Sequence, residues 1–128
     1  DVDSFKLYND RHGHLAGDNA LRGVAKVLQH GRRANDVVGR YGGEEFAILL
    51  VDVASAAAKD VADRIVSQIA EFPFEFGSFQ PLGRLTISAG VSTAPGDGVD
   101  AATVLMAADR ALFAAKNAGR NTVRVAGK

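Results

Sequence analysis

The chain has 128 residues, enough for one compact domain with a core of ordinary size, and 47% of them are hydrophobic. Fifteen basic and fifteen acidic side chains cancel, so no large net field favours non-specific binding of polyanions, and a nucleic-acid binder is not expected. The absence of cysteine excludes disulfides, zinc sites with cysteine ligands and thiol catalysis.

The ends and the hydropathy of the chain indicate where it works. No apolar run approaches the roughly 20 residues that span a bilayer, and no signal peptide is present. A cytoplasmic location without direct membrane contact is expected for this domain, although a longer parent protein could be membrane-anchored. Because the chain starts at Asp1 without a methionine, residues 1–128 are predicted to be one domain taken from a longer protein.

The first half of the chain contains two helical patterns and a hairpin. Residues 18–31 have apolar side chains at helical spacing, and Asp18 can cap the N-terminus of that helix. Two apolar, β-prone runs at residues 37–41 and 46–51 are separated by a glycine pair, which predicts an antiparallel hairpin. Residues 54–72 predict a second amphipathic helix.

The second half alternates in the same way. Residues 74–83 predict a loop or a weak hairpin, and residues 85–92 alternate in the manner of a strand. Asp100 can cap a third helix that runs to about Asn117, and residues 122–126 form a last short strand. Helices and strands alternate without a strict βαβ rhythm. The fold class is therefore predicted to be α+β, with helices over a largely antiparallel sheet.

Two acidic clusters are candidates for a metal site. The first is Asp1-Val2-Asp3 and the second is Glu44-Glu45, at the tip of the predicted hairpin. If the fold brings Asp1 and Glu44 to about 4 Å, their repulsion is about 4 kcal/mol at an effective dielectric near 20, and a divalent cation removes it. Hard oxygen ligands select Mg²⁺ or Mn²⁺. The alternative is that these acids are simply solvated in a turn.

Two further groups suit a nucleotide. Gly42 and Gly43 lack Cβ atoms and so let phosphates or a sugar approach the backbone closely. Asn9 and Asp18 could converge on guanine, because a carboxylate accepts from the N1–H and exocyclic amine donors that adenine lacks at those positions. The alternative for Asp18 is a helix cap and nothing more.

Two basic residues could hold a triphosphate. Lys116 and Arg120 are four apart, on one face if helical geometry persists, although cations are favoured at helix C-termini in any case. The histidines His12, His14 and His30 form no metal-ligand spacing with a third partner, and they are expected in loops or at the surface.

Taken together, these residues resemble the GGDEF family in its GGEEF form, over essentially the whole chain and in the expected order. The segments that carry the resemblance are Asp1-Val2-Asp3-Ser4-Phe5-Lys6, Asn9-Asp10, His14, Gly17-Asp18, Arg40-Tyr41-Gly42-Gly43-Glu44-Glu45-Phe46, Ala108-Asp109-Arg110-Ala111-Leu112-Phe113-Ala114-Ala115-Lys116 and Gly119-Arg120-Asn121. Phe113 departs from the pattern, since the family usually has tyrosine there.

The resemblance implies a fold similar to the nucleotide-cyclase and ferredoxin-like palm, a largely antiparallel central sheet surrounded by helices. It also implies that a helix and the body of a central strand precede Asp1 and are missing from this excerpt. The implied activity is that of a diguanylate cyclase, which condenses two GTP to cyclic di-GMP and two pyrophosphates in a homodimer.

The resemblance also implies site residues. Asp1, Glu44 and Glu45 match catalytic positions, and Asp1, Glu44 and the carbonyl of Val2 match the ligands of two Mg²⁺ or Mn²⁺ ions. The positions that match GTP-binding residues are Asn9, Asp18, Phe5, Lys6, Gly42, Gly43, Lys116 and Arg120. The positions that match the RxxD site for inhibition by cyclic di-GMP are Arg33, Asp36 and Arg64.

Two alternatives remain open from the sequence. One is a domain that has lost turnover and serves as a sensor of GTP or cyclic di-GMP, although the hairpin signature and Asp1 are intact. The other is a cyclase of a different product, such as cyclic AMP-GMP, against which Asn9 and Asp18 argue as guanine readers.

Overall fold

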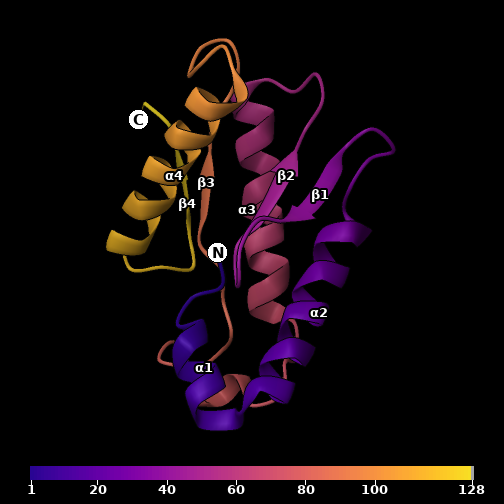
Figure 1. The fold of residues 1–128 in the computed structure, drawn as a ribbon, viewed down its shortest axis with the longest axis vertical. Helices are drawn as coiled ribbons and strands as arrows, with labels where there is room; N and C mark the ends of the chain where they lie inside the picture. The colour runs from indigo at the N-terminus through magenta and orange to yellow at the C-terminus, as the bar shows by residue number, and fades with distance from the viewer. Residues whose placement is uncertain (128) are drawn as a thin grey trace.

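The computed structural model describes residues 1–127 and shows helices and short strands in alternation (Figure 1). In chain order the elements are α1 (Phe5–His12), α2 (His14–His30), β1 (Val37–Arg40), β2 (Phe46–Leu49), α3 (Ser55–Glu71), the 3₁₀ turn η1 (Gly77–Phe79), β3 (Ala89–Val91), α4 (Ala101–Asn117) and β4 (Val123–Val125). The α+β class is confirmed. Within residues 1–127 no helix is both long and apolar enough to cross a bilayer.

The strands form two small sheets instead of one largely antiparallel sheet. β1 and β2 pair antiparallel, with Val37 opposite Leu49, as the glycine pair predicts. β3 and β4 pair parallel, with Ala89 opposite Val123. The parallel pairing follows from the connection, because α4 carries the chain back along the sheet between the two strands.

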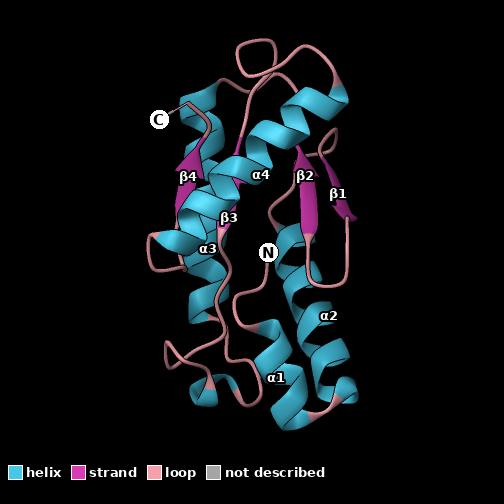
Figure 2. Cartoon of the chain, turned by 60° about the vertical axis from the view of Figure 1, so that its left-hand side comes forward, coloured by secondary structure: helices cyan, strands magenta, loops and turns pink. Residues whose placement is uncertain are grey.

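The segment at the start of the chain lies between the two sheets (Figures 1 and 2). Val2 forms an antiparallel bridge with Ile87, and its N–H donates to the carbonyl of Glu44 at 3.1 Å. The N–H of Asp3 donates to the carbonyl of Thr86 at 2.9 Å. Residues 1–3 therefore connect the β1–β2 hairpin to the segment that leads into β3.

The core lies between α2, α3 and the β3–β4 sheet. Val24 of α2 and Ile69 of α3 are fully buried, as is Leu85, just before β3. Figure 2 shows α3 and α4 on opposite sides of β3 and β4. The buried positions of α2 include Leu21, Val24 and Leu28, as the helical spacing predicts.

Three local predictions are wrong. The helix α1 was not expected, and it buries only Phe5 and Tyr8 among polar neighbours. Asp18 caps nothing, because α2 already begins at His14, after Gly13 at φ 89°. His12, expected in a loop or at the surface, is half-buried at the end of α1, and its ring stacks on Phe76 with centroids 4.3 Å apart.

Other boundaries shift without changing the element. α4 begins after Asp100, whose carboxylate accepts from the N–H of Thr103 in a capping box, as predicted. Of the strand expected over residues 85–92, Ala89–Val91 forms β3, and Ile87 pairs antiparallel with Val2 as an isolated bridge. Residues 74–83 are a loop with one 3₁₀ turn.

A substitution at Gly90 would test how closely α4 packs on β3. A Cβ atom there would collide with the backbone of Ala108 and Leu112 and lie 3.0 Å from the carbonyl carbon of Ala111. Gly90→Ala should therefore lower the free energy of unfolding by about 1–3 kcal/mol, measured by urea denaturation. Gly39→Ala is the control, since a Cβ at Gly39 meets no atom within 4 Å. Equal stability of both variants would contradict this packing.

Candidate functional site

The carboxylate of Asp1 lies beside the tip of the β1–β2 hairpin. The backbone bond from Val2 to Glu44 joins the two segments. The two acidic clusters of the sequence therefore meet through their backbones.

The two oxygens of the Asp1 side chain have different surroundings. Oδ2 accepts from Nζ of Lys116 at 3.1 Å, and the Asp1 side chain is only 4% exposed. Oδ1 is buried and accepts no hydrogen bond from the described residues. A buried carboxylate oxygen without a donor is costly, so Asp1 offers a strong acceptor.

The donor chemistry at this place fits a hard divalent cation. Asp1 and Glu44 can supply carboxylate oxygens and Val2 a carbonyl oxygen, which are the ligands that Mg²⁺ takes alongside water and phosphate. Residues 1–127 contain no group of three or more His, Cys, Asp or Glu side chains placed to hold a metal. Substrate phosphates or water would therefore have to complete such a site.

The hairpin tip is closed by bonds to one carbonyl. The N–H groups of Tyr41 and Gly42 both donate to the carbonyl of Glu45, at 2.8 and 3.2 Å. The Arg40 guanidinium donates to the carbonyls of Gly42 and Gly43, the shortest contact being 2.6 Å. Neither glycine adopts left-handed φ, and a Cβ at Gly43 would meet no atom within 4 Å. The backbone at Gly43 is therefore open to the approach of a ligand.

The two expected base-reading residues come from neighbouring helices. Asn9 on α1 places its Oδ1 where a Cβ on Gly17 of α2 would have to be. Asp18 is the next residue after Gly17 and is exposed. The Asn9 Oδ1 atom is buried and accepts no hydrogen bond from the described residues. Gly17 thus provides the space in which the Asn9 carboxamide lies against α2.

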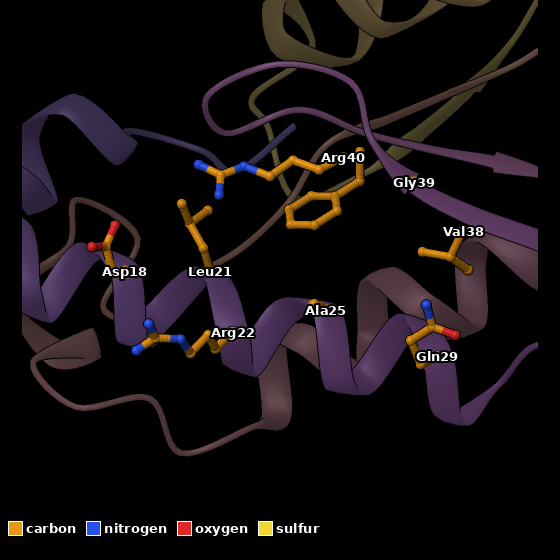
Figure 3. A pocket seen from close by; sticks show the side chains of 9 residues that line it. Asp18, Leu21, Arg22, Ala25, Gln29, Val38, Gly39 and Arg40 are labelled. Carbon is orange, nitrogen blue, oxygen red and sulfur yellow. The ribbon is translucent and has the colours of Figure 1, made fainter.

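A cavity of about 360 Å³ opens between α2 and the hairpin. Figure 3 shows the Arg40 side chain reaching over Leu21 of α2, on the side where Asp18 lies. The cavity is lined by Asp18, Leu21, Arg22, Ala25, Gln29, Val38, Gly39, Arg40 and Phe46. Its size is within the usual range for small-molecule sites. A second cavity, of about 510 Å³ between α4 and β4, contains none of the predicted site residues.

The expected phosphate-binding residues differ in burial and in their place relative to the helices. Phe5 is buried, whereas Lys6 is exposed and forms an ion pair with Asp10 at 3.1 Å. Lys116 is in the last turn of α4, but the helix ends at Asn117, so Arg120 lies beyond it. The condition under which both would share a helix face, that helical geometry persists to Arg120, is therefore not met, and Arg120 lies in a left-handed backbone run at φ 64°.

Arg33 and Asp36 form a pair away from Asp1. Nε and Nη2 of Arg33 donate to the two Asp36 oxygens at 3.0 and 2.9 Å, and Asp36 is buried. This fork holds the pKa of the Asp36 carboxyl well below its usual range, with help from the N–H groups of Arg33 and Val51. Arg64 is exposed on α3 and, within the described residues, has no hydrogen bond or ion pair with either partner.

Sequence reasoning missed the separate role of Asp3. It grouped Asp3 with Asp1, yet the Asp3 carboxylate accepts from the hydroxyls of Thr86 and Ser88 and from the N–H of Asn121. The signal was present, because Thr86 and Ser88 alternate onto one face of a strand-like apolar run. Two hydroxyls facing one side of a buried strand indicate a polar partner in the core.

Comparison with known proteins identifies a family that matches this chain. Residues 1–122 match the family described as "Diguanylate cyclase, GGDEF domain". The response regulator PleD of Caulobacter vibrioides is 41% identical over 123 residues, which are 96% of this chain and 27% of that protein. Diguanylate cyclase DgcP of Pseudomonas aeruginosa is 41% identical over 126 residues, which are 98% of this chain and 18% of that protein. The chain thus spans a minor part of these relatives.

Solved structures agree with the sequence relatives. The active GGEEF domain of a diguanylate cyclase from Vibrio cholerae has a TM-score of 0.85 at 35% identity, covering 100% of this chain and 80% of that one. The GGDEF domain of DgcB from Caulobacter crescentus, in complex with c-di-GMP, has a TM-score of 0.87 at 33% identity, covering 100% and 75%. Because the family match covers residues 1–122 and both the relatives and the solved structures agree with it, the chain belongs to the family of diguanylate cyclase GGDEF domains.

Proposed function

We propose that this chain is the catalytic domain of a diguanylate cyclase, which condenses two GTP to cyclic di-GMP and two pyrophosphates. The observation that carries the proposal is the hydrogen bond from Val2 N–H to the Glu44 carbonyl, at 3.1 Å. It joins the segment of Asp1 to the hairpin tip of Glu44 and Glu45. Relatives named as diguanylate cyclases, at about 40% identity over nearly the whole chain, support the same activity.

In the proposed reaction, the 3′-hydroxyl of each GTP attacks the α-phosphorus of the other. A P–O bond forms, the bond between the α-phosphorus and the bridging oxygen breaks, and pyrophosphate leaves while the hydroxyl gives up its proton. Two such steps close the ring and release two pyrophosphates. Because there is little covalent chemistry for protein groups in such transfers, catalysis depends on positioning and charge neutralisation.

The carboxylates of Asp1 and Glu44 and the Val2 carbonyl would hold two Mg²⁺ or Mn²⁺ ions. Such ions, when bound, stabilise charge on the α-phosphate and on the departing pyrophosphate. The protein's own contribution is to hold two acidic groups together, with Lys116 offsetting part of the Asp1 charge. Glu45 is proposed to act in catalysis beside Glu44.

The guanine would be read by Asn9 and Asp18. The buried and unpaired Oδ1 of Asn9 suits a donor on the base, and the Asp18 carboxylate suits the N1–H and exocyclic amine. Phe5 and Lys6 would line the triphosphate together with the open backbone at Gly42 and Gly43. Lys116 and Arg120 would supply its positive charge.

One domain holds one GTP in this proposal, so two domains must face each other. A symmetric homodimer brings each 3′-hydroxyl to the substrate of the partner, and a two-fold axis makes both attacks equivalent. Residues 1–128 act as one unit in this arrangement, and no nucleic acid takes part.

The experiment that tests the proposal uses the full-length protein. It is incubated with GTP and Mg²⁺, and the products are separated and identified by mass spectrometry, with ATP in parallel. Cyclic di-GMP is the expected product. GTP binding without product from a verified dimer would favour a sensor of GTP or cyclic di-GMP, and a mixed AMP-GMP product would reject the guanine assignment.

Glu44→Gln should reduce metal-dependent turnover at least about 100-fold, because the amide keeps the shape of the side chain and removes the charge that a cation needs. Initial rates are measured at several Mg²⁺ concentrations. Glu71→Gln, an exposed position at the end of α3, is the matched control and should keep the wild-type rate. A near-normal rate for Glu44→Gln would count against its role as a ligand.

Gly17→Ala should raise the KM for GTP about tenfold, because the new Cβ occupies the place of the Asn9 Oδ1 atom and lies 3.2 Å from Cζ of Phe5. Steady-state kinetics measure the change. Gly31→Ala at the other end of α2 is the control, since a Cβ there meets no atom within 4 Å. An unchanged KM would show that Asn9 does not contact the base.

Arg33→Ala should relieve inhibition by cyclic di-GMP without abolishing turnover. The Arg33 guanidinium, which is bonded to Asp36 here, would turn part of its donors to the guanine or phosphate of the product, with Arg64 as a supporting group. Turnover is measured with increasing added cyclic di-GMP, and Arg64→Ala should weaken inhibition in the same direction. Lys26→Ala on α2 serves as the control. Undiminished inhibition of Arg33→Ala would remove this site from the proposal.

A further inference from the structure

Asp3 is the most completely bonded buried carboxylate near the candidate site. Asp3 is only 4% exposed. Oδ1 accepts from the Ser88 hydroxyl at 2.6 Å, and Oδ2 accepts from the Thr86 hydroxyl at 2.8 Å and the Asn121 N–H at 3.1 Å. With three donors on two oxygens, Asp3 differs from Asp1, whose Oδ1 has none.

These donors come from distant parts of the chain. Thr86 and Ser88 lie in the segment that leads into β3, and both are fully buried. Asn121 lies between α4 and β4, just after Arg120. The Asp3 side chain therefore joins the chain start to the segment before β3 and to the loop of Arg120.

The loop of Arg120 needs such an anchor because its backbone conformation is unfavourable. Gly119, Arg120 and Asn121 have φ values of 110°, 64° and 48°, and two of them are not glycine. Side chains with a Cβ rarely occupy the left-handed region, and surrounding contacts must hold them there. Arg120 N–H donates to the Ala115 carbonyl at 3.2 Å, and Asn121 N–H donates to Asp3.

The backbone of residues 1–3 does not depend on the Asp3 side chain. Val2 N–H bonds to Glu44, Asp3 N–H bonds to the Thr86 carbonyl, and Ser88 N–H bonds to the Asp1 carbonyl at 3.0 Å. Gln80 Nε2 holds the carbonyls of Asp3 and Ser4 from a further side, at 3.3 and 3.2 Å. The contact that the Asp3 carboxylate adds beyond these bonds and beyond the Thr86 and Ser88 hydroxyls is the one to Asn121 N–H.

We propose that Asp3 is a positioning residue, whose carboxylate fixes the 119–121 loop and thereby sets how Arg120 meets the triphosphate. Its oxygens are filled by hydroxyl and amide donors, so it is not one of the metal ligands. The kinetic part of this inference rests on the proposed function, because it assumes that GTP is the substrate. The structural part does not.

The first test measures the loop itself. Hydrogen–deuterium exchange with mass spectrometry on the full-length protein follows peptides that cover residues 119–121. Asp3→Ala should speed exchange there about tenfold or more, since the Asn121 N–H loses its charged acceptor. Asp3→Asn should keep most of the protection, because its oxygen can still accept from Asn121 while the Ser88 hydroxyl turns to accept from the amide.

The second test measures substrate affinity. Asp3→Ala should raise the KM for GTP about tenfold with a smaller change in kcat, and Asp3→Asn should restore the KM to within about threefold of wild type. Ser88→Ala is the matched control: it removes one buried bond to Asp3 and leaves the Asn121 contact, so the KM should stay near the wild-type value.

A double-mutant cycle identifies the path of the effect. In an Arg120→Ala background, Asp3→Ala should add little further to the KM, because the residue through which it acts is gone. If Asp3→Ala does not yield folded protein, Asp3→Ser replaces it, since its hydroxyl ends one bond short of the Asn121 N–H.

The outcomes separate the two proposals. Unchanged exchange at residues 119–121 in Asp3→Ala, or an equal KM increase in Ser88→Ala, would overturn the positioning role. Additive effects of Asp3→Ala and Arg120→Ala would overturn it as well. Absence of cyclic di-GMP from the wild-type protein would overturn the proposed function alone, and the exchange result would still decide whether Asp3 anchors the loop.

Discussion

The candidate site depends on one backbone contact, the hydrogen bond from Val2 N–H to the Glu44 carbonyl at 3.1 Å. It fixes a segment with two acidic side chains against a hairpin tip with two more. Bringing such charges together is unfavourable without compensation, and the chain supplies it in two forms. Lys116 pairs with Asp1, and hydroxyl and amide donors satisfy Asp3. Of the two aspartates, Asp1 is the one with a buried oxygen that accepts no hydrogen bond from the described residues.

The two aspartates of the chain start thus have different chemistry for a simple geometric reason. Residues 1–3 are extended between the hairpin and the segment before β3, and each side offers different groups. Asp3 meets the hydroxyls of Thr86 and Ser88, whereas Asp1 meets the ammonium of Lys116. The residue type therefore does not determine the role of either aspartate. Their roles depend on the partners that tertiary packing brings to each.

Much of the fold followed from the sequence, and the failures have physical causes. The hairpin, α3 and the capped start of α4 follow from local signals, namely a glycine pair, apolar periodicity and the Asp100 cap. α1 lacked such a signal, because only Phe5 and Tyr8 are buried and the rest of the helix is polar. The β3–β4 pairing is non-local, and no short-range pattern reports its parallel direction. Asp18 was predicted as the cap because the true N-cap of α2 is Gly13, five residues earlier, which has no side chain to indicate a helix start.

The same division applies to the site. The acidic clusters could be recognised because their residues are neighbours in sequence and match a family pattern. Arg33 and Asp36 match such a pattern too, but their pairing with each other was not predicted. The position of Arg120 could not be predicted, since a spacing of four suggested a shared helix face and α4 ends before Arg120. What holds Arg120 is a left-handed loop that is bonded to a carboxylate 118 residues away in sequence. A helix end would place a cation by its own geometry, whereas this loop is held by the bond from Arg120 N–H to the Ala115 carbonyl and by the bond from Asn121 N–H to Asp3.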